Sequence, residues 1–195
     1  GFLIGLTGMG GGALMTPFLI TIMKFDPVLA VGTDLAFAAI TKIIGGTQHQ
    51  HETKLSIKPV LWIAVGSIPS SIIGSQFILR QTDNRHLIDE VLPTLLGWTL
   101  IVVSTIIIAQ VFRLLGPKKE TEVRYPSALA LIIIGAVGGA LVGMTSIGGG
   151  TVIIALLLLF FSMPLNHMVG LDVMHGALLA IVSALSYIFA GQTDW

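Results

Sequence analysis

Long stretches without an acidic or basic side chain alternate with short polar segments along the chain. Charge-free runs cover Gly1 to Met23, Pro59 to Leu79 and Val91 to Phe112. A helix that spans a bilayer needs about 20 residues, so the second and third runs each predict one spanning helix. A further run, Tyr125 to Leu171, is more than twice that length and must fold back at least once.

Glycines and polar segments divide these runs into a set of helices, which predicts an all-α, polytopic membrane protein. The expected helices are two short ones near 12–23 and 150–161 and longer ones near 28–48, 57–79, 88–112, 125–145 and 165–189. Residues 113–124 are expected to form a cytoplasmic linker between a first transmembrane repeat, 1–112, and a second, 125–195. The chain lacks an initiator Met, so we expect a fragment in which the first repeat misses its N-terminus and the second its C-terminus.

Composition supports a membrane protein and excludes several other classes. Hydrophobic residues make up 54% of the chain and charged residues 10%, against about 25% charged in ordinary soluble domains. The mean hydropathy is +0.93. The net charge of zero gives no indication of a nucleic-acid partner. The absence of cysteine excludes disulfides, thiol catalysis and cysteine-held metals.

Two copies of one unit follow each other at a constant offset of 138 residues. The segment GMTSIGGGTVII...VGLD, residues 143–172, aligns without a gap on GLTGMGGGALMT...VGTD, residues 5–34. Nine of the thirty positions are identical, among them a glycine triplet and the VGxD box. Accidental similarity between two apolar segments would not reproduce both features at the same spacing, so the chain contains an internal repeat.

The distribution of Lys and Arg among the loops predicts opposite orientations for the two copies. The linker 113–124 and the loop 48–58 carry six basic residues, against three on the other side, and cytoplasmic loops are the basic ones. The loop 24–27 then lies outside, while its counterpart 162–166 lies inside. Inverted repeats with interrupted helices are typical of secondary transporters.

Each glycine triplet precedes a helix that is too short to span the membrane alone. Its N-terminus is therefore expected within the bilayer, where free backbone N–H groups bind anions and glycine allows close approach. An alternative is that the glycines only permit tight helix packing. No GK[ST] follows either triplet, so a phosphate loop is not indicated. The candidate substrate-binding residues are Thr7, Gly10, Gly11, Gly12, Thr33, Thr145, Ser146, Gly148, Gly149 and Gly150.

Ionisable residues within the membrane are costly and usually functional. Asp34, Lys42, Asp172 and His175 are the candidates for coupling or charge balance. Asp172 and His175 share a helix face and suit proton uptake, whereas copy one has Phe37 in place of the histidine. Lys42 could instead snorkel to the surface, and the aspartates could make structural hydrogen bonds. The other histidines lie in or near loops, where solvated roles are expected rather than metal binding: His49, His51, His86 and His167.

The pattern GxGGG, VGTDLAFAAITK, a His-bearing loop, then SIGGG, VGLDVMH and GQTDW resembles the sulfite exporter TauE/SafE family of membrane permeases. The resemblance implies transport of sulfite, sulfoacetate or another sulfur-containing or organic anion across the bacterial cytoplasmic (inner) membrane, driven by an ion gradient. The family signature falls on Gly10 to Gly12, Gly32 to Asp34, Gly148 to Gly150, Gly170 and Asp172. Leu171 stands where copy one has Thr33, which removes a symmetric hydroxyl contact.

The sequence thus predicts a secondary transporter and not an enzyme, with no cofactor and no metal site. Its expected partners are a small anion, the lipid bilayer and a proton or sodium ion as the coupling ion. One alternative is a passive anion channel. Another is an intramembrane hydrolase with Ser146 as nucleophile and His175 as base, although Ser146 lies in TSIG and lacks a GxSxG elbow. The sequence does not indicate the oligomeric state.

Overall fold

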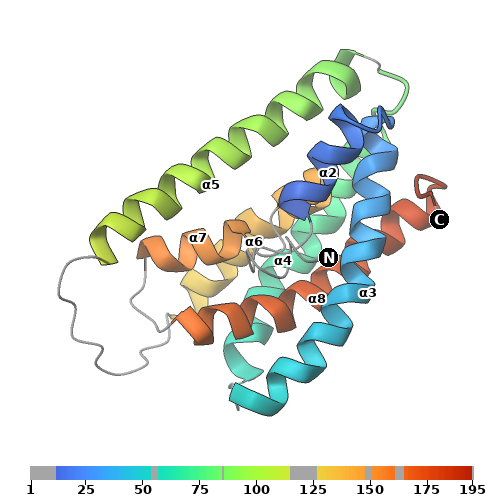
Figure 1. Cartoon of the computed structure of the whole chain (residues 1–195). Coiled ribbons are helices and arrows are strands. Elements are labelled where there is room, and N and C mark those ends of the chain that lie inside the picture. Colours follow the sequence, from blue (N-terminus) through green and yellow to red (C-terminus); the bar gives the residue numbers. More distant parts are fainter. Residues whose placement is uncertain are drawn as a thin grey trace.

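In the computed structural model, helices account for nearly all of the described part of the chain, residues 12–53, 57–84, 86–114, 127–147, 151–160 and 165–194. No strand occurs within these ranges, so the predicted all-α class is confirmed. Figure 1 shows how the elements are arranged. They are α2 (Gly12–Thr21), α3 (Pro27–Thr53), α4 (Ile57–Leu79), η1 (Leu87–Val91), α5 (Leu92–Leu114), α6 (Ala128–Thr145), α7 (Thr151–Phe160) and α8 (Leu165–Phe189).

Five of the described helices are long and apolar enough to cross a membrane, which agrees with the predicted multi-pass membrane protein. The candidate spans are Pro27–Ile44, Ile57–Leu79, Leu87–Ile106, Ala128–Thr145 and Met168–Phe189. The short helices α2 and α7, each of 10 residues, fall below this length, as the sequence predicted. The linker predicted at 113–124 lies almost entirely outside the described residues.

The helix predicted at 88–112 begins differently from the expectation, with one π-helical turn, η1. The backbone N–H of Leu92 donates to the carbonyl of Leu87, five residues earlier. Pro93 has no N–H and cannot donate to the carbonyl four residues before it, which removes an α-helical bond at this point. The wider turn precedes the regular α5 that follows.

Helices α4 and α6 pack closely in a parallel direction through a face of glycines on α6. A Cβ added to Gly135, Gly139 or Gly143 would lie between 2.1 and 2.3 Å from a backbone carbonyl oxygen of α4. The α4 residues that supply these oxygens are also four apart and follow in the same order: Ile63, Ser67 and Ser71. Such small-residue faces let membrane helices approach closely, so this pair joins the segments that the sequence assigns to the first and second copies.

The two helices that carry the VGxD boxes, α3 and α8, pack against each other and cross in Figure 1. Gly32, early in α3, lies against Tyr187 and the carbonyl of Gln192 at the far end of α8. Lys42, later in α3, lies against Asp172, early in α8. The order is reversed along the two helices, so these equivalent elements of the two copies run antiparallel.

Helix α7 folds back beside α6 rather than continuing its direction. Ser146 ends α6 in a left-handed conformation with φ 59°. A Cβ on Gly138 would lie 2.7 Å from Cγ1 of Ile153, so the start of α7 contacts the middle of α6.

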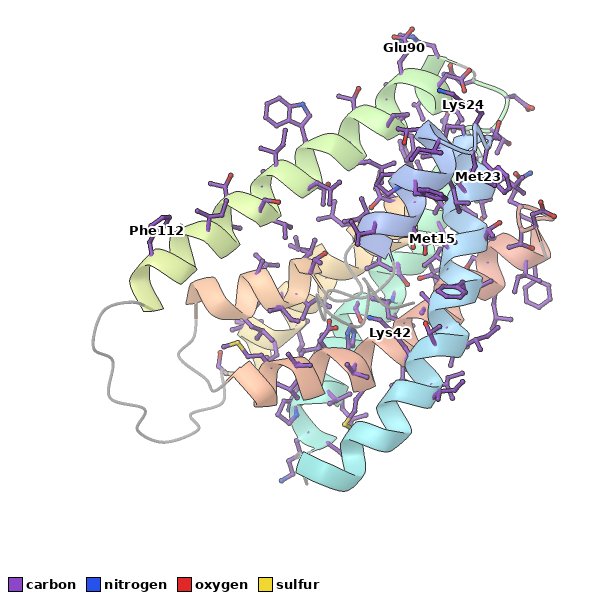
Figure 2. All side chains as sticks on the ribbon, viewed as in Figure 1. Met15, Met23, Lys24, Lys42, Glu90 and Phe112 are labelled. Atoms are coloured by element: carbon purple, nitrogen blue, oxygen red, sulfur yellow. The ribbon has the colours of Figure 1, made fainter. Side chains whose placement is uncertain are left out.

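Lys24 and Glu90 lie at the same end of the molecule, whereas Phe112 lies at the far end of α5 (Figure 2). Lys24 and the turn before α5 therefore share an end, as the loop charges predicted.

Candidate functional site

A buried ion pair lies where α3 crosses α8. The ammonium nitrogen of Lys42 is 3.7 Å from Oδ2 of Asp172, and the two side chains are 11% and 4% exposed. Figure 2 shows Lys42 in the middle of the molecule, not at an end. The side chain therefore points toward the carboxylate of the other copy, and the alternative that it snorkels to the membrane surface is not what the structure shows.

His175 lies one helical turn beyond Asp172 on α8 and is fully buried. Its Nε2 is 2.6 Å from the hydroxyl oxygen of Ser67 on α4. Three helices, α3, α4 and α8, thus bring an ammonium, a carboxylate, an imidazole and a hydroxyl together. We call these residues the Lys42 cluster: Lys42, Asp172, His175 and Ser67.

The Lys42 cluster has unused hydrogen-bonding capacity. Within the described part of the chain, the Nζ of Lys42, the Oδ1 of Asp172 and the Nδ1 of His175 are buried without a hydrogen-bond partner. Buried polar atoms are nearly always paired with protein or water. Three unpaired atoms in neighbouring residues are therefore typical of a site that receives a polar ligand or water.

Asp34, the equivalent of Asp172 in copy one, has quite different surroundings. Its side chain is fully buried on α3. The hydroxyl of Thr16 on α2 donates to Oδ2 at 2.5 Å, and the hydroxyl of Ser146 donates to the same oxygen at 2.8 Å. Thr16 belongs to copy one and Ser146 to copy two, so the hydrogen bonds of this carboxylate come from hydroxyls of both copies.

The other predicted substrate-binding residues are distributed unevenly in the structure. The Thr33 hydroxyl accepts a hydrogen bond from the backbone N–H of Asp194 at 3.0 Å. The Thr145 hydroxyl donates to the carbonyl of Leu141 at 2.7 Å, within α6. Gly12 is the first residue of α2. The remaining candidates lie outside the described residues: Thr7, Gly10, Gly11, Gly148, Gly149 and Gly150.

In the described residues, Ser146 and His175 do not form the hydrogen-bonded pair that the hydrolase alternative needs. Ser146 bonds the Asp34 carboxylate, while His175 bonds Ser67, so the two members of the expected dyad have separate partners. His86 pairs with Glu90 at an exposed site. Among the ranges that the structure describes, no group of three metal-ligating side chains occurs.

Two residues of the site, Thr16 and Ser67, were not among the sequence candidates. Thr16 is a fully buried polar residue in the middle of α2, between apolar neighbours. Ser67 is the first of three serines spaced four apart along α4, and the other two are Ser71 and Ser75. Serines at helical spacing within a charge-free span indicate a polar stripe that faces other helices, and this signal would have identified Ser67.

Comparisons with known proteins agree with this membrane architecture. The family model described as "Sulfite exporter TauE/SafE" matches residues 1–195. The "Probable membrane transporter protein YjnA" of Bacillus subtilis is 36% identical over 199 residues, which cover the whole of this chain and 78% of that protein. YdhB of the same organism is 24% identical over the whole chain and 77% of its own length. A probable membrane transporter protein of Haemophilus influenzae is 28% identical over 98% of this chain and 70% of its own. No solved structure matches this chain.

Proposed function

This chain belongs to the TauE/SafE sulfite exporter family, and on that premise we propose that it is a secondary transporter for sulfite, an organosulfonate or a related small anion. The family and the relatives, named as probable membrane transporters, support transport as the general activity. The choice of a small anion rests on the Lys42 cluster.

The observation that carries the proposal is the incomplete ion pair between Lys42 and Asp172. A separation of 3.7 Å between Nζ and Oδ2 is longer than a hydrogen bond, which rarely exceeds about 3.2 Å. The ammonium of Lys42 therefore keeps its hydrogen atoms available. An oxyanion placed beside it would gain charge-assisted hydrogen bonds, which are stronger than neutral ones.

The position of the Lys42 cluster also fits a transporter. Antiparallel packing of α3 on α8 supports an inverted relation between the two copies. Transporters built from inverted repeats bind their substrates at the interface between repeats, near the bilayer midplane. The starts of α2 and α7, which follow the two glycine triplets, would add backbone N–H donors for the same anion.

Binding of the anion changes the charge balance inside the membrane. When an anion pairs with the ammonium of Lys42, Asp172 loses its counter-charge in an apolar environment. An unpaired charge is costly there. A cation that enters with the anion would remove this cost. Gradient-driven transport of the anion together with a cation follows from this arrangement.

The test is uptake of radiolabelled sulfite, with sulfoacetate and taurine as comparisons, into proteoliposomes that contain the full chain. We expect accumulation of at least one anion when a proton or sodium gradient is imposed. Lys42→Met should abolish it, whereas Lys58→Met, at an exposed position, should not. Equilibration of the anion without accumulation would indicate a passive channel instead of a coupled carrier. Absence of flux for all three anions would overturn the substrate class.

A further inference from the structure

We propose that Asp34, Thr16 and Ser146 form a binding site for a monovalent cation, Na⁺, and that this cation is the coupling ion. The coupling role rests on the proposed transport function, whereas the binding of Na⁺ does not depend on it. The site is distinct from the Lys42 cluster and uses the carboxylate of the other copy.

The side chains around Asp34 provide oxygen ligands from three helices. Thr16 comes from α2, Asp34 from α3 and Ser146 from the end of α6, and the two hydroxyl oxygens lie 2.5 and 2.8 Å from Oδ2 of the carboxylate. A hydroxyl that donates its single hydrogen to a carboxylate still has lone pairs to offer. The three groups can therefore keep their mutual hydrogen bonds and coordinate a cation at the same time.

The second carboxylate oxygen of Asp34 favours a metal cation over a proton, since protonation of Oδ2 would leave Oδ1 unpaired. Oδ1 of Asp34 is buried, and no hydrogen-bond partner for it occurs in the described ranges. A proton on Oδ1 would have no acceptor among those residues, so the O–H group of the carboxylic acid would stay unpaired at a cost. A cation needs no acceptor beyond Oδ1 itself and would satisfy that oxygen directly.

The end of α6 adds a further attraction for a cation. Ser146 is the C-cap of this helix, and the C-terminal end of a helix carries partial negative charge. In transporters, the C-terminal ends of interrupted helices and their carbonyl groups coordinate Na⁺. A carboxylate beside such an end is in an unfavourable field unless a cation accompanies it.

The sum of buried charge is compatible with one monovalent cation. Among the described membrane helices, the carboxylates of Asp34 and Asp172 face only one ammonium, that of Lys42. With both carboxylates ionised and His175 neutral, the sum is −1. Lys42, eight residues after Asp34 on α3, acts on both carboxylates through space but forms its ion pair with Asp172. One Na⁺ at Asp34 brings the sum to zero.

The ligand set favours Na⁺ over a divalent ion. Calcium sites gather six to eight oxygens and generally several carboxylates, whereas this site offers one carboxylate and two hydroxyls. A divalent ion would leave excess positive charge in the apolar interior, which is costly. A single negative charge with neutral oxygens matches an alkali cation.

Binding is tested by thermal unfolding of the full chain in detergent, without any anion substrate. NaCl replaces choline chloride or KCl at constant ionic strength. A ligand that binds only the folded state raises its stability, so we expect saturating Na⁺ to raise Tm by about 3 °C or more, with a smaller effect of K⁺. An equal response to K⁺ or no response to Na⁺ would overturn the site.

Variants show which residues produce the Na⁺-induced rise in Tm. Asp34→Asn should abolish it, and Thr16→Val should weaken Na⁺ affinity by about tenfold, as loss of a metal-orienting group does. Thr21→Val is the matched control on the same helix, because the Thr21 hydroxyl bonds only the Pro17 carbonyl at an exposed position. A Na⁺ response that survives in Asp34→Asn would contradict the proposal. If Asp34→Asn fails to fold, the comparison of Thr16→Val with Thr21→Val decides.

Coupling is tested separately in proteoliposomes. A Na⁺ gradient should drive anion accumulation, and Thr16→Val should raise the Na⁺ concentration for half-maximal uptake by about tenfold. Uptake that follows a pH gradient and is indifferent to Na⁺ would overturn the coupling role. If none of the anions moves while Na⁺ still stabilises wild type but not Asp34→Asn, the proposed function fails and the cation site stands.

Discussion

Asp34 and Asp172 occupy the same position in the two copies of the repeat, yet their partners differ in chemistry. Asp34 accepts hydrogen bonds from two hydroxyls and has no ion-pair partner in the described part of the chain. Asp172 faces the ammonium of Lys42. The backbone around them is alike, since both lie early in long helices that begin at equivalent residues, Pro27 and Leu165.

The two copies share a helical scaffold, while the side chains around each carboxylate have diverged. Copy two has Ala180 where copy one has Lys42, and copy one has Phe37 where copy two has His175. Each carboxylate also has a partner from the opposite copy, Ser146 for Asp34 and Lys42 for Asp172. This difference is the basis of our proposal that the Asp34 position binds a cation and the Lys42 cluster at Asp172 binds an anion.

Loss of the Lys42–Asp172 ion pair should lower the stability of the protein more than the other substitutions discussed below. Lys42→Met leaves Asp172 buried without a counter-charge, and removal of one partner of a buried pair destabilises by about 3–5 kcal/mol. We expect a large loss of Tm in detergent. The double variant Lys42→Met with Asp172→Asn should recover most of this stability but not the uptake of anions. A double variant as unstable as the single one would contradict the pairing.

A smaller loss of stability is expected when Gly32, the glycine of the first VGxD box, is replaced by alanine. This substitution tests the packing of α3 against α8. A Cβ on Gly32 would lie 1.8 Å from the carbonyl oxygen of Gln192. Gly32→Ala must therefore displace backbone and should destabilise by about 1–3 kcal/mol. Gly97→Ala is the control, because no atom lies within 4 Å of its added Cβ. Equal thermal stability of Gly32→Ala and wild type would show that this glycine has no packing role.

Much of the fold follows from the sequence because the relevant signals are local. Charge-free runs of membrane-spanning length and the glycine triplets predict where helices begin and end, and most observed bounds fall within a few residues of those expected. The repeat predicted that α2 and α7 would be short and that α3 and α8 would correspond. The exception at α5 arises from Pro93, whose missing N–H permits the π turn.

The partners of the site could not be predicted from the same signals. Thr16 and Asp34 are 18 residues apart, and Ser67 and His175 are 108 apart. Which faces of two helices meet depends on packing, here on the glycine face of α6 against α4. The repeat showed that Asp34 lacks the neighbouring histidine of Asp172, with Phe37 in its place, but an alignment of the two copies does not show what each carboxylate contacts.

Loss of the Ser67 hydroxyl should cost little stability, and it tests whether the sites at Asp34 and Asp172 are separate. Ser67→Ala removes the partner of His175 Nε2 and should destabilise by about 1–2 kcal/mol, measured as a fall in Tm. Ser70→Ala is the control, since the Ser70 hydroxyl bonds only carbonyls of its own helix, at Gly66 and Ser67. Ser67 belongs to the Lys42 cluster and makes no contact with Asp34 that the structure shows. The Na⁺-induced rise in Tm should therefore persist in Ser67→Ala at its wild-type Na⁺ affinity, while the apparent affinity for the anion falls. If the Na⁺ response disappeared together with anion affinity, Asp34 and Asp172 would act as one site, and the division of labour between the copies would be wrong.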